Sequence, residues 1–409
     1  MSIEVRLKAA YPAALATLRR ICGELQQAED LLQDAVERAL RSWPRDGEPE
    51  DALAWLVTAG KHRWIDLQRR QGLQRGYELG QLPAPSAPPP DAEALDRSRI
   101  NDDLLKLIFT CCHPALAQSA QIALTLRTIA GLSVTEIAAA FVIDPRALEQ
   151  RITRAKRKIA QAAIPYRVPD HQELPARISA VACVIYLIFN EGYSAANGDH
   201  PLRSDLCVIA IGLARQLHRL CGKNPEADGL LALLLFQHAR AAARVGADGE
   251  LITLDRQDRG LWNRALIAEA SVLIDQALQR RQPGPYQVQA AIAALHCESA
   301  SADQTDWAQI AELYAILGRM QPNAVVTINH AVALLKCGRR DQALNLLDTL
   351  PEREQLEHYL PFHVARGAAL HELERRTEAL LAYQRALELA RNSATIRHLS
   401  GAIDQIRSS

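Results

Sequence analysis

The sequence predicts an all-α protein, and three features of its 409 residues support that prediction. Hydrophobic residues make up 48% of the chain but aromatic residues only 5%, and runs of β-branched residues are short. Apolar residues recur at i, i+3 and i+4 almost throughout, which is the spacing of amphipathic helices. Residues 321–409 also show an internal repeat of helical units, which is typical of a helical-repeat domain.

Length and composition limit the kind of protein further. The length indicates about two to four domains. No apolar run reaches the roughly 18–20 residues of a membrane-spanning helix, and the N-terminus lacks the apolar stretch of a signal peptide, so we expect no membrane contact. The eight cysteines are scattered apart from the adjacent Cys111 and Cys112, which favours reduced thiols in a cytoplasm over a disulfide framework.

The formal net charge of zero hides two basic strips. Residues 146–158 contain six basic residues and one acidic residue, and residues 61–75 contain five basic residues and one acidic residue. A neutral chain with such strips can still bind a phosphate backbone through them.

The first half of the chain divides at a proline-rich segment. Residues 28–40 carry an apolar helical stripe with acidic and amide side chains elsewhere on the helix, and a second helix is predicted from about Ala52 to Arg70. Residues 81–90 read QLPAPSAPPP, and five prolines in ten residues predict an extended linker, for which a passive tether is the simplest interpretation.

A helix-turn-helix is predicted after this linker. The segment from Ser133 to Glu136 fits an S-x-x-E capping box, which opens one short helix. Asp144 followed by Pro145 is typical of an N-cap and first helical position, and the helix that it opens is the basic one. Two short helices joined by a tight turn, the second strongly basic, indicate DNA binding. The turn, Val142-Ile143-Asp144, lacks the usual glycine.

The repeat in residues 321–409 has an offset of 36 residues, close to the roughly 34-residue period of tetratricopeptide repeats. Five small or apolar positions of the first unit recur in the second: Ala331, Leu334, Ala343, Leu347 and Leu350 correspond to Gly367, Leu370, Ala379, Tyr383 and Ala386.

At this point the sequence resembles a known family. Residues 28–43, AEDLLQDAVERALRSW, followed by residues 54–70, AWLVTAGKHRWIDLQRR, look like region 2 of extracytoplasmic-function sigma factors. Residues 120–159, with EIA and RITRAKRKI, look like region 4. The segments IYLIFNEGYSA, LRSDLCVIAIGLAR and PGPYQVQAAIAALH are similar to the subgroup with a large C-terminal extension ending in tetratricopeptide-like repeats.

The resemblance implies five parts and a role in promoter-directed transcription initiation. The expected parts are region 2 (1–76), a proline-rich linker (77–100), region 4 with its helix-turn-helix (101–168), a helical extension (169–320) and tetratricopeptide-like repeats (321–409). The implied partners are promoter DNA and core RNA polymerase, through its β′ and β subunits, with a further protein partner for the repeats. We expect the extension to modulate core or DNA access in place of a separate anti-sigma factor.

The resemblance also assigns residues to three contacts. The family docks its first acidic helix on a coiled coil of β′, which implies core binding by Glu29, Asp30, Gln33 and Asp34, although such charges alone are typical of a solvated helix face. For the −10 promoter element, the resemblance implies residues 44–51 together with Lys61, His62, Arg63, Arg69 and Arg70. His62 departs from the asparagine common in the family, and Trp64, on an apolar stripe, is expected in the core.

For the −35 element, the basic helix offers Arg146, Gln150, Arg151, Arg154 and Lys158, since recognition helices use Arg toward guanine and Gln toward adenine. Two other functions fit less of the sequence. One is a helix-turn-helix regulator that acts without core polymerase, and the other is a repeat scaffold that has lost promoter activity.

No enzyme activity, cofactor or metal is expected. The sequence has no Walker A, G-x-S-x-G or dinucleotide glycine pattern. Cys111-Cys112-His113 cannot all face one ion from a helix, so buried thiols are the favoured interpretation. Asp255, Asp258, Arg259 and Trp262 could line a groove, but helix caps and surface ion pairs are the favoured interpretation.

Overall fold

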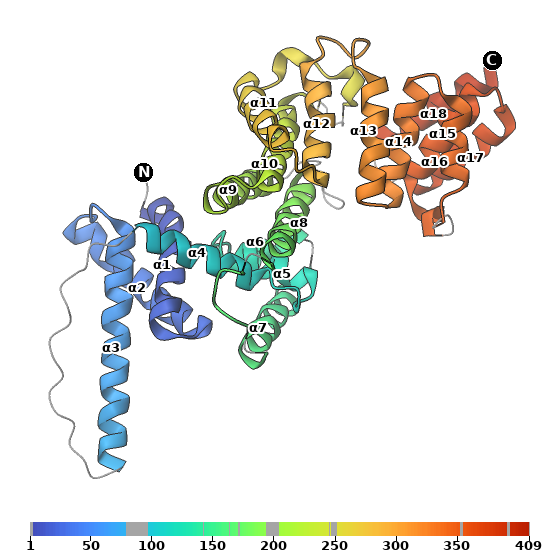
Figure 1. Ribbon diagram of the computed structural model, residues 1–409. Helices are drawn as coiled ribbons and strands as arrows, with labels where there is room; N and C mark the ends of the chain where they lie inside the picture. The colour runs from blue at the N-terminus through green and yellow to red at the C-terminus, as the bar shows by residue number, and fades with distance from the viewer. Residues whose placement is uncertain are drawn as a thin grey trace. The chain divides into compact units, whose positions relative to one another are not determined.

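The computed structural model describes residues 3–78, 97–141, 143–162, 164–170, 172–193, 204–244, 246, 252–351, 355–390 and 393–408. Over these residues the regular elements are all helices, which confirms the all-α prediction (Figure 1). The proline-rich segment predicted as a linker lies outside the described residues.

The chain forms two compact units. Unit 1 comprises Met1–Gly192 and Arg203–Gly222, and unit 2 comprises Tyr193–Leu202 and Lys223–Ser409. The division between the units therefore falls inside the segment that the sequence suggested as one helical extension.

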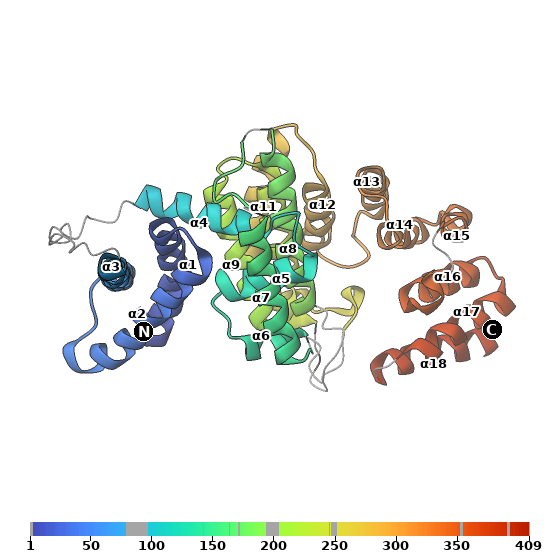
Figure 2. The ribbon, with the colours of Figure 1, turned by 90° about the horizontal axis from the view of Figure 1, so that it is seen from below.

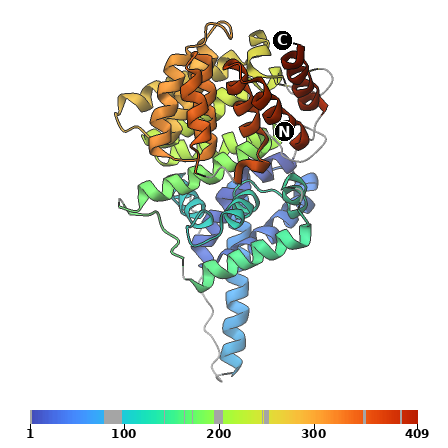
Figure 3. The same ribbon diagram turned by 90° about the vertical axis from the view of Figure 1, so that its right-hand side faces the viewer.

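Unit 1 begins with three helices: α1 (Ile3–Cys22), α2 (Leu25–Asp46) and α3 (Ala52–Glu78). They pack on one another around Leu15, Leu32 and Leu56, whose side chains are fully buried. Gly60 permits a close approach of α3 to α1, because a Cβ atom there would lie 2.8 Å from a methyl carbon of Leu18. The C-terminal end of α3 continues beyond the predicted end at Arg70 and extends past α1 and α2 (Figures 1 and 3).

The next four helices are α4 (Arg97–Cys111), α5 (Gln118–Thr128), α6 (Val134–Phe141) and α7 (Pro145–Gln161). Helices α6 and α7 pack against each other and against α5, so the predicted helix-turn-helix is present. Both predicted caps are confirmed. The Ser133 hydroxyl accepts a hydrogen bond from the Glu136 N–H (3.1 Å), Glu136 accepts one from the Ser133 N–H (2.7 Å), and Asp144 accepts one from the Ala147 N–H (3.0 Å). Val142, in the glycine-free turn, lies outside the described residues.

Helices α8 (Leu174–Tyr193) and α9 (Ser204–Leu220) complete unit 1. Arg177 of α8 places its guanidinium over the Phe109 ring and donates to the Phe109 carbonyl (2.5 Å). The expectation that no segment is apolar enough to span a membrane is wrong for α8, which has 20 residues and a mean hydropathy of 1.4 over its most apolar window. Several of its apolar side chains, including Val184, Ile188 and Phe189, are buried within the protein.

Unit 2 begins with α10 (Pro225–Ala239), three short 3₁₀ turns, η1 (Ala241–Ala243), η2 (Leu254–Arg256) and η3 (Arg259–Leu261), and α11 (Arg264–Gln279), α12 (Pro285–Glu298) and α13 (Trp307–Met320). Helix α10 is apolar on all sides because it packs against both α11 and α12. Gly229 lets α12 approach closely, since a Cβ atom there would lie 2.7 Å from the backbone nitrogen of Gln287.

The end of unit 2 contains α14 (Ala324–Lys336), α15 (Arg340–Asp348), η4 (Gln355–His358), α16 (Leu360–Glu372), α17 (Arg376–Leu389) and α18 (Ser393–Ser408). Successive helices pack as antiparallel neighbours (Figure 2). Helix α16 begins and ends 36 residues after α14, and α17 begins 36 residues after α15. The predicted offset therefore holds in the structure.

The turns of the two helix pairs repeat as well. Gly338 and Glu374 both adopt positive φ, at 74° and 57°. The N–H of Arg339 donates to the Leu334 carbonyl, and the N–H of Arg375 donates to the Leu370 carbonyl, both at 2.9 Å. Each first helix thus ends in a left-handed residue, the usual way to satisfy its last carbonyl groups.

Candidate functional site

Helix α7 exposes a polar, mostly basic face to solvent. Its buried side is Leu148, Ile152, Ala155 and Ile159, which packs on the rest of the helix-turn-helix. Among the predicted −35 residues, Arg146, Gln150, Arg154 and Lys158 are exposed, whereas Arg151 is partly buried. Four of the five predicted side chains are therefore on the exposed surface of the second helix.

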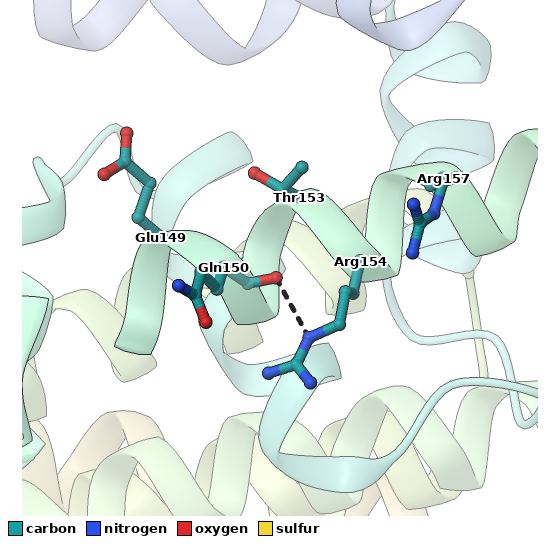
Figure 4. A pocket seen from close by; sticks show the side chains of 5 residues that line it. All are labelled: Glu149, Gln150, Thr153, Arg154 and Arg157. Atoms are coloured by element: carbon teal, nitrogen blue, oxygen red, sulfur yellow. Dashed lines mark hydrogen bonds between the residues drawn. The ribbon is translucent and has the colours of Figure 1, made fainter. Parts of the chain in front are cut away.

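A shallow cavity of about 430 Å³ lies on this face (Figure 4). Its lining residues are Glu149, Gln150, Thr153, Arg154 and Arg157. Arg154 is held along the helix because its Nε donates to the Gln150 carbonyl oxygen (3.3 Å). Thr153 and Arg157 were not among the sequence candidates, although they follow Gln150 at i+3 and i+7 and so share its face.

The predicted −10 residues lie on α3 and differ in exposure. His62, Arg69 and Arg70 are exposed, whereas Lys61 and Arg63 are partly buried. Trp64 is also only partly buried, so the expected core position is not fully realised.

Arg6 of α1 holds the loop that precedes α3, and the sequence analysis did not identify it. Its guanidinium pairs with the Glu48 carboxylate (2.6 Å) and donates to the carbonyl groups of Pro49 (2.5 Å) and Glu50 (3.1 Å). Loop positions from Gly47 to Asp51 are mostly exposed. Arg6 therefore fixes the backbone of the predicted −10 loop, while most side chains of that loop stay exposed to solvent.

The four predicted core-binding residues on α2 are not equivalent. Asp30 and Gln33 are exposed. Asp34 is shared with α3, since its carboxylate lies 3.4 Å from Nε of Arg63. Glu29 is largely buried, with 13% of its side chain exposed, and it pairs with Lys156 of α7.

This Glu29–Lys156 ion pair is part of a junction between the first three helices and the helix-turn-helix segment. Lys156 also lies 3.4 Å from the Gln26 side-chain oxygen, and its own side chain is 16% exposed. Nearby, Arg20 of α1 pairs with Asp103 of α4 at 2.7 Å, and the Asp103 side chain is 1% exposed. The junction therefore includes two ion pairs that link α1 and α2 to α4 and α7.

Tyr166, after α7, joins the same junction. Its hydroxyl lies 2.9 Å from the carbonyl oxygens of both Ala16 and Asp103. Burial, reinforced by the Asp103 carboxylate, raises the pKa of Tyr166 well above its usual value. The guanidinium of Arg19 covers its ring at 4.9 Å. Tyr166 therefore stays neutral and acts as a structural hydrogen-bond donor.

The adjacent cysteines are buried thiols, as expected. Burial raises the pKa of Cys112 to about 12 and that of Cys111 well above its ordinary value. The Cys112 sulfur lies 3.4 Å from the Thr125 hydroxyl oxygen. Within the described ranges, no three His, Cys, Asp or Glu side chains are grouped so as to hold a metal ion.

Comparisons with known proteins match this arrangement. The Sigma-70 region 2 family matches residues 7–74, which span α1 to most of α3, and the Sigma-70 region 4 family matches residues 106–159, which include α5, α6 and most of α7. A family of unknown function (DUF6596) matches residues 177–278, from α8 to α11, and so includes parts of both units.

The chain is also 45% identical over 406 residues to an uncharacterized protein of Rhizobium meliloti (strain 1021), and the match covers 99% of this chain and 96% of that protein. Region 2 and region 4 occur in the predicted order, and the helical extension follows them. The chain therefore belongs to the sigma-70 family, as a sigma factor of the extracytoplasmic-function type with a C-terminal helical extension, and serves promoter-specific transcription.

Proposed function

We propose that α7 reads the −35 element, that α3 and the loop before it hold the melted −10 element, and that the open part of α2 docks on the β′ subunit of core RNA polymerase. The exposed basic face of α7 is the observation that best supports this proposal. Arg146, Arg154 and Lys158 can neutralise phosphates, and Gln150 lies among them with an amide suited to a base edge.

For the −10 element, the proposal uses cations that solvent can reach. Arg69 and Arg70 are exposed near the end of the matched region 2 segment, and His62 is exposed one turn or more before them. Arginine on phosphates supplies salt-dependent affinity, while stacking of unpaired bases supplies selectivity. The loop that Arg6 anchors offers a fixed backbone beside which a flipped base can bind.

For core binding, the open residues Asp30 and Gln33 form the first contact in this proposal. Glu29 joins only after its ion pair with Lys156 is exchanged. An acidic face suits a basic partner surface and steers association. Core polymerase and the chromosome are in the cytoplasm, so we expect this activity there. The protein acts by binding rather than by catalysis.

Reconstitution with core polymerase tests the proposal. The purified chain should co-elute with core enzyme on size exclusion and support run-off transcription from a promoter selected from a random library. Duplex binding without core association would instead indicate a helix-turn-helix regulator. Core association that gives no transcript from any library promoter would indicate a scaffold.

We propose further that the tetratricopeptide-like pairs of unit 2 bind a protein partner and that unit 2 modulates polymerase or DNA access. Because α8 and α9 belong to unit 1, a truncation should end at Gly222 rather than before α8. A cut before α8 would expose the α8-facing core and confuse misfolding with regulation. If the chain truncated at Gly222 matches the full chain in transcript yield and promoter choice, the regulatory role of unit 2 is wrong.

A further inference from the structure

Three arginines between α10 and α11, Arg240, Arg244 and Arg259, have no carboxylate partner among the residues that the structure describes. Arg240, directly after α10, is 6% exposed. Its Nη2 atom bonds the side-chain oxygen of Gln237 and lies 3.5 Å from the Tyr193 hydroxyl, while its buried Nε has no acceptor. A buried guanidinium normally has an anionic partner, because removing its charge from water costs several kcal/mol.

Two neighbouring arginines stack on aromatic rings instead of forming ion pairs. The Arg244 guanidinium lies 3.7 Å from the centre of the Tyr193 ring, and that of Arg259 lies 4.7 Å from the centre of the Trp262 ring. Arg259 also donates to the carbonyl oxygens of His296 (2.7 Å) and Ser299 (2.5 Å) at the end of α12. In the part of the chain that the structure describes, none of Arg240, Arg244 and Arg259 has a carboxylate within ion-pair distance.

Buried polar atoms without partners lie in the same place. Trp262 is 3% exposed, and its Nε1–H has no acceptor among the residues that the structure describes. Nδ1 of His296 is likewise buried without a partner. Burial, Arg240 and Arg259, in that order, lower the pKa of His296 to about 4. The imidazole is therefore neutral at physiological pH, and the surrounding field is positive.

The sequence alone favoured caps and surface ion pairs for Asp255, Asp258, Arg259 and Trp262. Asp258 does cap η3, since it accepts from the Gly260 N–H at 2.8 Å. Arg259 and Trp262, however, belong to the cationic group rather than to an ion pair. A group of neighbouring cations with buried N–H groups that have no acceptor among the described residues needs an explanation, and a bound anion or water is the usual one.

We propose that Arg240, Arg244, Arg259, Trp262 and His296, here called the arginine cluster, bind a small anion that carries a carboxylate or phosphate group. Planar guanidinium groups match both anions with paired N–H donors. Arg244 and Arg259 are partly exposed and Arg240 is buried, which suits a small ligand better than the flat surface of a macromolecule. The arginine cluster lies within unit 2. The proposed anion binding there does not depend on the role of the protein in transcription.

Ligand-dependent stabilisation of the full chain tests this site. Thermal unfolding and tryptophan fluorescence are measured while sodium phosphate or sodium acetate replaces sodium chloride at constant ionic strength and pH. We expect a saturable rise in the unfolding midpoint with at least one of the two anions, because a ligand of the folded state stabilises it. The phosphate and acetate arms decide which of the two anions the site prefers.

Three variants separate a site from a general charge effect. Arg240→Gln should weaken binding about tenfold or more, the usual effect of removing a charge-assisted hydrogen bond. Arg259→Lys keeps the charge and loses the planar fork, so it should also weaken binding, and it serves if the first variant does not fold. Arg256→Gln removes an exposed arginine of η2 and is the matched control.

The control should bind like the original chain. The proposal is overturned if neither phosphate nor acetate gives saturable stabilisation beyond chloride. It is also overturned if Arg256→Gln weakens binding as much as the Arg240 and Arg259 variants do.

Discussion

The acidic face of α2 and the basic face of α7 are the two surfaces of unit 1 that we propose bind polymerase and DNA, and they differ in which side chains are already paired within the protein. On α7, Gln150 and Arg154 are exposed to solvent, and Arg154 donates a hydrogen bond to the Gln150 carbonyl oxygen of the same helix. On α2, Glu29 is held by Lys156, which is itself a residue of α7. The proposed DNA-binding surface is therefore accessible as it stands, whereas Glu29 on the proposed polymerase-binding surface would first have to exchange its partner.

A substitution on the exposed face of α7 should have the largest effect, and it should lower DNA affinity. Arg154→Ala should lower affinity for a promoter duplex about 10- to 100-fold, because an arginine contact to a base or phosphate is worth about 1–3 kcal/mol. Fluorescence anisotropy at fixed salt with core-bound protein measures the change. Arg219→Ala, on the exposed surface of α9, is the control and should leave affinity unchanged. Equal losses from both variants would mean that α7 has no special role.

On α2, substitution of the paired residue Glu29 should mainly lower the stability of unit 1. Glu29→Ala leaves the largely buried Lys156 without its counter-charge and should destabilise unit 1 by about 1–3 kcal/mol. Asp30→Ala, one residue further along α2, removes an exposed carboxylate and should cost less than about 0.5 kcal/mol. Urea unfolding followed by circular dichroism compares the two.

A charge exchange then separates stability from binding. The double variant Glu29→Lys with Lys156→Glu should recover most of the lost stability but not the affinity for core polymerase. If it recovers both, Glu29 acts only in holding α7, and the assignment of Glu29 to core binding is wrong.

Releasing the occupied face should have a smaller and opposite effect. Lys156→Ala frees Glu29 and should tighten core binding by roughly two- to fivefold, because core no longer has to displace an ion pair whose Coulombic gain is largely offset by desolvation and whose net value is about 1 kcal/mol. Biolayer interferometry with core enzyme in the absence of DNA isolates this step. Weaker core binding in this variant would show that Lys156 helps rather than hinders docking.

The smallest expected effect concerns the capping box of Ser133 and Glu136 at the start of α6. Hydrogen bonds from the Ser133 N–H and hydroxyl lower the pKa of Glu136 below its usual 4.5. The carboxylate form is the one favoured by folding, so its contribution is present above pH 4.5 and is lost as pH falls through the lowered pKa. Glu136→Gln should remove the loss of stability at acid pH. It should also cost about 0.5 kcal/mol of stability at pH 7. Thermal unfolding between pH 3 and 7 measures it, and Glu149→Gln, on exposed α7, should keep the original profile.

Local chemistry made several parts of the fold predictable from sequence. Ser133 with Glu136, and Asp144 with Pro145, identify helix starts because the capping atoms are at most three residues from the groups that they cap. The 36-residue repeat could also be recognised from the sequence, because equivalent positions of the two units are buried and therefore both carry small or apolar residues.

The junction in unit 1 could not be predicted in this way. Glu29 and Lys156 are 127 residues apart, and Tyr166 lies 150 residues from the carbonyl that it contacts. Nothing in a helical period identifies such partners, because side-chain periodicity marks which face is buried and not what covers it. For the same reason the sequence treated α8 and α9 as part of an extension, although they pack within unit 1.

The matched offsets of α14–α15 and α16–α17 make the end of the chain a modular array. The helix starts and the turn hydrogen bonds share one register, although α17 is longer than α15, so the two pairs are closely equivalent units. Stacked repeats contact only their neighbours, and residues 324–359 can therefore be duplicated in frame without a new kind of junction. The array can thus lengthen by whole units between α13 and α18, which gives evolution or an engineer a simple way to enlarge the surface of a sigma factor.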